Sequence, residues 1–140
     1  MTREEITAFF ARRQDAFARH DATALAAAHA EDCKYESPWA GTVSGRAAIE
    51  QAHRQWFTSF PDFAFQDYEL LIDGHRVAQI GTGVGTDIGG FMGLSPTGKR
   101  FQFPVVCLCT LNEYEIVHER RIYDFTGMLV QIGVLKARPA

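Results

Sequence analysis

The chain has 140 residues, of which 46% are hydrophobic and 22% are charged, a balance typical of one globular domain. Its 14 basic and 17 acidic side chains give a net charge of −3, and this argues against a nucleic-acid-binding surface because such surfaces gather positive charge. No apolar run is long enough to span a membrane. We therefore expect one domain over residues 1–140, with neither nucleic acid nor a membrane as a partner.

The N-terminus and the cysteines indicate a cytoplasmic location. Residues 1–5, MTREE, begin a polar helix and do not resemble a signal peptide. The three cysteines are Cys33, Cys107 and Cys109, and an odd number suits a reducing compartment. Cys107 and Cys109 have no second pair of ligands at metal-binding spacing, so we expect no metal site and interpret them as buried thiols on one strand face.

The first half of the chain predicts three helices. The first spans residues 3–20 and begins at a capping box formed by Thr2 and Glu5. Its apolar face consists of Ile6, Phe9, Phe10 and Phe17, with arginine and glutamine expected on the opposite face. Asp21 can cap a second, short helix that ends near residue 30. The third helix spans residues 46–60 and has the strongest helical periodicity in the chain.

The second half alternates with a period of two, which predicts strands at 63–72, 76–88, 99–112 and 116–125. A short strand at 33–37 and a turn at 42–45 precede the third helix, and one helical turn or a strand extension closes the chain over 126–135. Helices segregated from a mainly antiparallel sheet give an α+β fold. A strongly curved sheet whose concave side is covered by the three helices forms a cone-shaped barrel that encloses a pocket.

The strand at 99–112 has apolar residues on both faces, because Val105, Cys107 and Cys109 alternate with Val106 and Leu108. One face can cover the pocket. The other face predicts a homodimer that forms through the sheet.

The last long strand carries charged residues on both faces. His118, Arg120, Ile122 and Asp124 share one face, whereas Glu119 and Arg121 lie on the other. An aspartate in an apolar pocket can act as a general base near neutral pH, because desolvation raises its pKa. The alternative for Asp124 is an N-cap of the following segment or a surface carboxylate.

Three segments resemble a known family. Residues 89–100, GGFMGLSPTGKR, are similar to the G-x-F-M-G-x-x-P-T-G-[KR] segment of SnoaL-like polyketide cyclases. Residues 44–49, SGRAAI, with 60–62, FPD, resemble the third helix of that family, and residues 123–133, YDFTGMLVQIG, resemble its C-terminal motif. The segments occur in family order and cover nearly the whole chain. The family belongs to the nuclear transport factor 2-like superfamily, whose fold is the cone described above.

The resemblance implies a function. SnoaL-like cyclases close a ring by intramolecular aldol condensation, without a metal or cofactor. Their essential aspartate falls at Asp124, which would take a proton α to a carbonyl. The resemblance therefore implies a cofactor-free acid/base enzyme that acts on a small hydrophobic carbonyl compound, with Arg120 or His118 as the polarising group.

The pocket is expected to be shaped by residues of the third helix and of the segment before it. These are Tyr35, Trp39, His53, Trp56 and Phe57. Trp39 either closes the pocket mouth or packs on the sheet edge, and His53 is either a satisfied core histidine or a partner for a polar ligand. Two alternative functions remain: a non-catalytic ligand-binding or dimerisation module, and an epoxide hydrolase. The hydrolase would require a second inward carboxylate, and we identify none.

Overall fold

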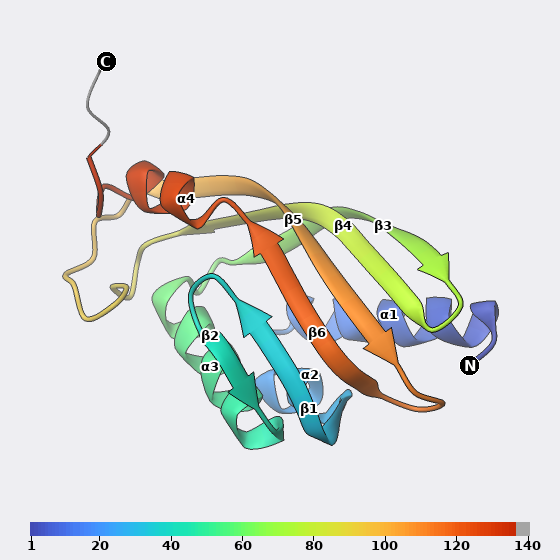
Figure 1. Cartoon of the computed structure of the whole chain (residues 1–140). Helices are drawn as coiled ribbons and strands as arrows, with labels where there is room; N and C mark the ends of the chain where they lie inside the picture. Colours follow the sequence, from blue (N-terminus) through green and yellow to red (C-terminus); the bar gives the residue numbers. More distant parts are fainter. Residues whose placement is uncertain (137–140) are drawn as a thin grey trace.

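The computed structural model describes residues 1–136 and shows the α+β architecture expected from the sequence. Helices α1 (Arg3–Ala18), α2 (Ala22–Ala27) and α3 (Arg46–Ser59) lie together on one face of a curved sheet (Figure 1). A fourth helix, α4 (Phe125–Gln131), follows the last strand at one end of the sheet. No helix among residues 1–136 is both long enough and apolar enough to cross a membrane.

The sheet has six strands in the order β2-β1-β6-β5-β4-β3. All neighbours pair antiparallel except β1 and β6, which run parallel. The strands are β1 (His29–Ser37), β2 (Gly41–Ser44), β3 (Ala64–Asp73), β4 (Arg76–Thr86), β5 (Arg100–Leu111) and β6 (Ile116–Tyr123). The cone and its three covering helices are therefore confirmed.

Two expectations for the N-terminal half were wrong in detail. The turn expected at 42–45 is part of strand β2, because the chain reverses earlier, at residues 38–40. There the Ser37 hydroxyl accepts a hydrogen bond from the Ala40 amide, and Gly41 takes a positive φ that favours glycine. The second helix ends at Ala27, and β1 begins at once with His29. Of the two alternatives for the closing segment, the helix is found as α4.

The inner face of the sheet is filled with aromatic rings. Gly83 and Gly85 on β4 lie opposite Phe103 and Phe101 on β5, and a Cβ atom at either glycine would meet the partner ring at 2.6 to 2.8 Å. The glycines therefore allow the rings to lie flat on the strand. Cys107 and Cys109 are buried on the same face as free thiols, as the sequence indicated.

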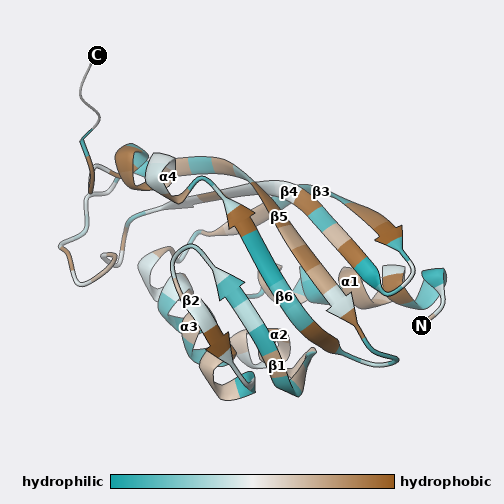
Figure 2. Cartoon of the chain, in the orientation of Figure 1, coloured by the Kyte–Doolittle hydropathy of each residue, from teal (hydrophilic) through white to brown (hydrophobic). Residues whose placement is uncertain are grey.

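Within residues 1–136, no helix covers the outer face of the sheet (Figure 1). Its apolar residues lie in adjacent cross-strand positions, and Leu71 and Ile122 are 58% and 47% exposed. We call this set the outer apolar strip. It consists of Leu71, Ala78, Ile80, Val106, Leu108 and Ile122. Figure 2 shows a hydrophilic stretch along the middle of β6, next to this strip.

Candidate functional site

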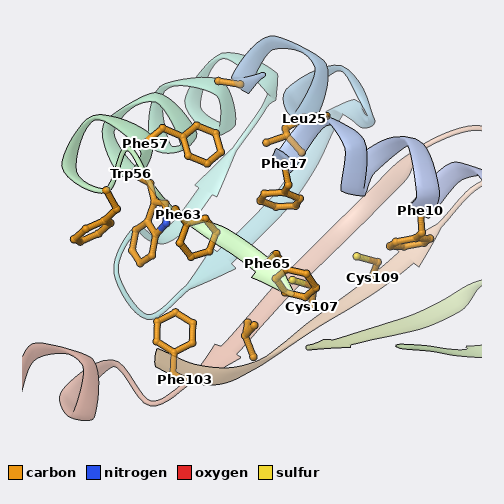
Figure 3. Packing of buried hydrophobic residues seen from close by; sticks show 14 of the residues in the cluster. Phe10, Phe17, Leu25, Trp56, Phe57, Phe63, Phe65, Phe103, Cys107 and Cys109 are labelled. Atoms are coloured by element: carbon orange, nitrogen blue, oxygen red, sulfur yellow. The ribbon is translucent and has the colours of Figure 1, made fainter. Parts of the chain in front are cut away.

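A cavity of about 30 Å³ lies between α3 and the inner face of β1, β5 and β6. Its walls are mostly aromatic, and Figure 3 shows Trp56 and Phe63 side by side beneath α3, with Phe103 across from them on β5. The polar groups that line it are Tyr35, Ser37, His53, Cys107, Arg121 and Tyr123. The volume holds only about two water molecules, so a larger ligand requires the aromatic wall to move.

Arg121 is the only charged side chain that lines this cavity, within the part of the chain that the structure describes. Its Nε donates a hydrogen bond to Glu119 Oε2 at 2.9 Å, and its Nη2 donates to His53 Nε2 at 3.1 Å. The guanidinium also lies over the rings of Phe17 and Tyr35, at 5.2 and 5.3 Å from their centroids. These four contacts fix the guanidinium at the cavity wall.

Glu119 is completely buried behind Arg121. Its Oε2 also accepts a hydrogen bond from Arg13 Nη2 at 2.7 Å, and its Oε1 lies 2.7 Å from His29 Nε2. Burial alone would raise the pKa of this carboxyl, but Arg13, Arg121 and His29 hold the pKa well below its usual range. Glu119 is therefore an anion that anchors the buried Arg13 of α1 and the partly buried Arg121 of β6.

His53 has a defined tautomer. Its Nδ1 lies 2.9 Å from the Ile49 carbonyl, one helical turn back, so this nitrogen carries the proton and donates it. Nε2 is then the acceptor for Arg121. Burial, together with the Arg121 charge, lowers the pKa of His53 to about 3, so the ring is neutral near pH 7. The geometry supports the first alternative of the sequence analysis, a satisfied core histidine, and places His53 on the cavity wall.

The remaining polar groups of the cavity are neutral donors. Burial raises the pKa of Tyr35 far above its ordinary value and that of Tyr123 to about 12. The indole Nε1–H of Trp56 is buried, and no residue of the described chain accepts its hydrogen bond. A bound molecule therefore meets several hydrogen-bond donors in an otherwise apolar enclosure.

Asp124 lies outside this cavity, contrary to the expectation from the sequence. It is exposed and forms the N-cap of α4, where its Oδ1 accepts a hydrogen bond from the Gly127 amide at 2.8 Å. The physical reason is local: an aspartate at the end of a strand satisfies the free amides of the helix that follows. Of the two interpretations considered for Asp124, the geometry supports the N-cap.

Arg120 and His118 also lie away from the cavity, so the expectation that either polarises a ligand there was wrong. They point to the outer face of the sheet, where His118 Nε2 contacts Glu36 Oε2 at 2.5 Å and Arg120 is exposed. The opposite face of β6 carries Glu119 and Arg121 and turns inward. Glu119 is thus an inward carboxylate that the sequence analysis did not identify.

The residues expected to shape the pocket are mostly found there. Tyr35, Trp39, His53 and Trp56 line the cavity. Trp39 packs against Trp56 and Phe91, at 5.6 and 5.7 Å between ring centroids, so its ring belongs to the aromatic wall of the cavity. Phe57 does not line the cavity and instead stacks on His20 behind it, at 4.2 Å.

Sequence reasoning missed Arg13, although a signal was present. Residues 6, 9, 10, 13 and 17 follow helical spacing, so Arg13 shares the apolar face of α1 and does not lie on the polar face where we expected it. A charged residue in such a position requires a buried partner. A search for that partner on the strands would have pointed to the inward carboxylate, Glu119.

The chain matches one protein family and is similar to several solved structures. The family model for SnoaL-like polyketide cyclase matches residues 8–132. A putative polyketide cyclase from Xanthomonas campestris superposes with a TM-score of 0.85 at 21% identity, covering 94% of this chain and 98% of the other. AclR, a putative hydroxylase from Streptomyces galilaeus, gives 0.84 at 24% identity, covering 99% and 87%.

A third similar structure is a hypothetical protein with a ketosteroid isomerase-like fold from Catenulispora acidiphila, with a TM-score of 0.77 at 20% identity, covering 99% and 100%. No curated protein matches the sequence. At these identities the structural likenesses show the fold, which is that of the nuclear transport factor 2-like proteins. The family match covers most of the chain, and the chain therefore belongs to the SnoaL-like polyketide cyclase family.

Proposed function

We propose that this chain binds a small, mainly apolar carbonyl compound in the aromatic cavity, with the carbonyl oxygen placed at Arg121. The observation that carries the proposal is the position of this guanidinium, which lies on an aromatic wall and is held by Glu119 and His53. A fixed cation in a water-poor site polarises a carbonyl without reorganisation when the ligand arrives. Contact with the apolar walls supplies most of the binding free energy, and the hydrogen bond to Arg121 fixes the orientation of the ligand.

The simplest form of this function is a non-catalytic binding module, because no carboxylate lines the cavity among residues 1–136. The experiment is a titration with small aryl ketones such as acetophenone, followed through the indole N–H resonances of Trp39 and Trp56. Both tryptophans line the cavity, so ligand entry shifts both signals. If neither signal responds to any aryl ketone, the proposal fails.

One observation favours catalysis as a second candidate. The lone pair on Nε2 of the neutral His53 ring accepts a hydrogen bond from Arg121 Nη2, and it becomes a proton acceptor beside the polarising group when a ligand oxygen takes over that Arg121 donor. Together they could form an enolate by removing a proton α to the carbonyl, without a cofactor. Deuterium uptake by the methyl group of acetophenone in heavy water, lost in His53→Gln, would support catalysis. Binding without deuterium uptake would support the non-catalytic binding module instead.

We also propose that the chain forms a homodimer through the outer apolar strip. The strip is continuous across β3 to β6 and contains exposed leucine and isoleucine side chains. Sedimentation at micromolar concentration should show a dimer, and Leu108→Lys should give a monomer. A wild-type monomer would overturn this proposal. Because Cys33, Cys107 and Cys109 are free thiols, we propose a cytoplasmic location for this dimer.

A further inference from the structure

The charges buried around the cavity do not balance. Arg13, Glu119 and Arg121 form one connected network, with Arg13 and Arg121 both bonded to the same carboxylate oxygen. Even with His29 counted as neutral, this network has two cations and one anion. Glu119 is the only carboxylate in contact with either guanidinium, within residues 1–136.

A surplus charge in such a place is costly unless something compensates it. The side chain of Arg13 is 1% exposed and that of Arg121 is 13% exposed, with Arg121 facing the cavity. Desolvated ions are stable only when they are paired and hydrogen-bonded. The surrounding groups do not supply a negative charge, because burial raises the pKa values of Tyr35 and Cys107 and keeps them neutral.

Arg121, which lines the cavity, also has unused donors. A guanidinium carries five N–H groups, and the described residues accept two of them, one at Glu119 and one at His53. Three donors therefore remain, and Nη1 carries two of them. A carboxylate accepts this fork in a bidentate fashion, whereas a neutral carbonyl uses only one or two of the donors.

From this surplus cation and its unused fork we infer that the natural ligand is a small aromatic or aliphatic carboxylate that binds as the anion at Arg121. This inference rests on the proposed function and deepens it, since the carbonyl oxygen that Arg121 holds becomes one oxygen of a carboxylate. The aromatic walls hold the ring or alkyl body. The carboxylate replaces the missing counter-charge of the network.

The experiment compares benzoate with benzamide on the wild-type chain, because the two share their shape and differ in charge. We expect benzoate to bind on the order of 30-fold more tightly than benzamide, with shifts at the indole N–H signals of Trp39 and Trp56. Formate, which lacks the apolar body, should bind far more weakly than benzoate. Equal affinity of benzoate and benzamide would overturn the charged ligand and leave the pocket proposal standing.

Other outcomes separate the two proposals further. If benzoate binds no more tightly than formate, the site takes inorganic and small anions and the inference fails. If benzoate, benzamide and acetophenone all leave the indole signals unchanged, the proposed function fails with it. Arg121→Met should abolish the preference for benzoate over benzamide. This variant keeps the Arg13–Glu119 pair, so its network is neutral and it should fold; the wild-type comparison decides the question even if it does not.

Discussion

The two faces of β6 carry similar side chains in very different environments. On the outer face, His118 pairs with Glu36, and both side chains are more than a third exposed. On the inner face, Glu119 pairs with Arg121 and Arg13, and its side chain has no exposed surface. The first pair can exchange its bonds with water at little cost, whereas the second cannot.

The comparison shows that alternation along a strand separates two faces but does not say which one turns inward. That assignment depends on partners elsewhere in the chain. For β6 the partners are Arg13 and Phe17 on α1 and His53 on α3, which meet the Glu119 and Arg121 face. Contacts with the helices, and not the pattern of β6 itself, therefore determine that Arg121 faces the cavity.

The largest expected effect follows from removing the inner carboxylate. Glu119→Gln leaves the Arg13 and Arg121 guanidiniums buried without their counter-ion, which should lower the free energy of unfolding by about 3–5 kcal/mol. Urea denaturation measures the change. Its matched control on the outer face is Glu36→Gln, which should cost far less, because both side chains of that pair are exposed and can bond to water instead. Equal losses for the two variants would show that the faces do not differ as described.

The pH dependence of stability should show that His53 is neutral in the folded chain. Its pKa is about 3 in the folded chain and 6.5 in the unfolded chain, so below pH 6.5 the unfolded state binds a proton that the folded state excludes. This contribution to stability is complete above pH 6.5 and is lost as the pH falls towards 3.

We therefore expect the free energy of unfolding to fall with decreasing pH more steeply in the wild type than in His53→Gln, by about 1.4 kcal/mol per pH unit. Urea denaturation between pH 6.5 and 4.5 measures this difference. In that range the stabilisation from Glu119 is constant, because it is lost only as the pH falls below 4.5, the pKa of this carboxyl in the unfolded chain. Parallel curves for the two proteins would mean that His53 is not held neutral by its surroundings.

A smaller effect is expected at Asp124. Asp124→Ala removes the N-cap of α4 and should reduce stability by about 1 kcal/mol, whereas Asp124→Asn should change it by only a few tenths, since asparagine also caps. Both variants should bind aryl ketones as the wild type does. Loss of binding, or of deuterium uptake if it is observed, in Asp124→Asn would restore this residue to the functional site.

The smallest effect is expected at Arg120, on the outer face. Arg120 is exposed and forms no ion pair among the described residues. Arg120→Met should change the free energy of unfolding by no more than about 0.5 kcal/mol. A thermal or urea unfolding curve tests this, and a larger loss would reveal a structural role on the outer face.

Most of the fold could be predicted from the sequence, because hydrophobic periodicity and the residues that form caps and turns are local signals. The capping box of Thr2 and Glu5 and the cap at Asp21 were found where expected, as were the four long strands. Strand β2 was missed because it has only four residues, and they read as a turn. Its pairing with β1 depends on a reversal at residues 38–40, and the turn signals there, Ser37-Pro38 and Gly41, were not used to predict it.

The site was harder to predict because its decisive contacts are long-range. Tyr35, Trp39, His53 and Trp56 were expected at the pocket because they are large or polar residues near an apolar face. Arg121 and Glu119 were not, since the resemblance drew attention to Asp124 and the face it was assigned to. The bond between Arg13 and Glu119 joins residues 106 positions apart, and no local pattern contains it.

The most direct test of the account is a comparison of Arg121→Met with Arg120→Met, the same substitution at adjacent positions on opposite faces of β6. Titration of each variant with benzoate and acetophenone, read at the indole N–H signals, measures what each arginine contributes to binding. The account predicts that Arg120→Met binds like the wild type and that Arg121→Met loses affinity by on the order of 100-fold for benzoate. Equal affinities in the two variants would contradict it, because the cation on the inner face would then have no part in binding.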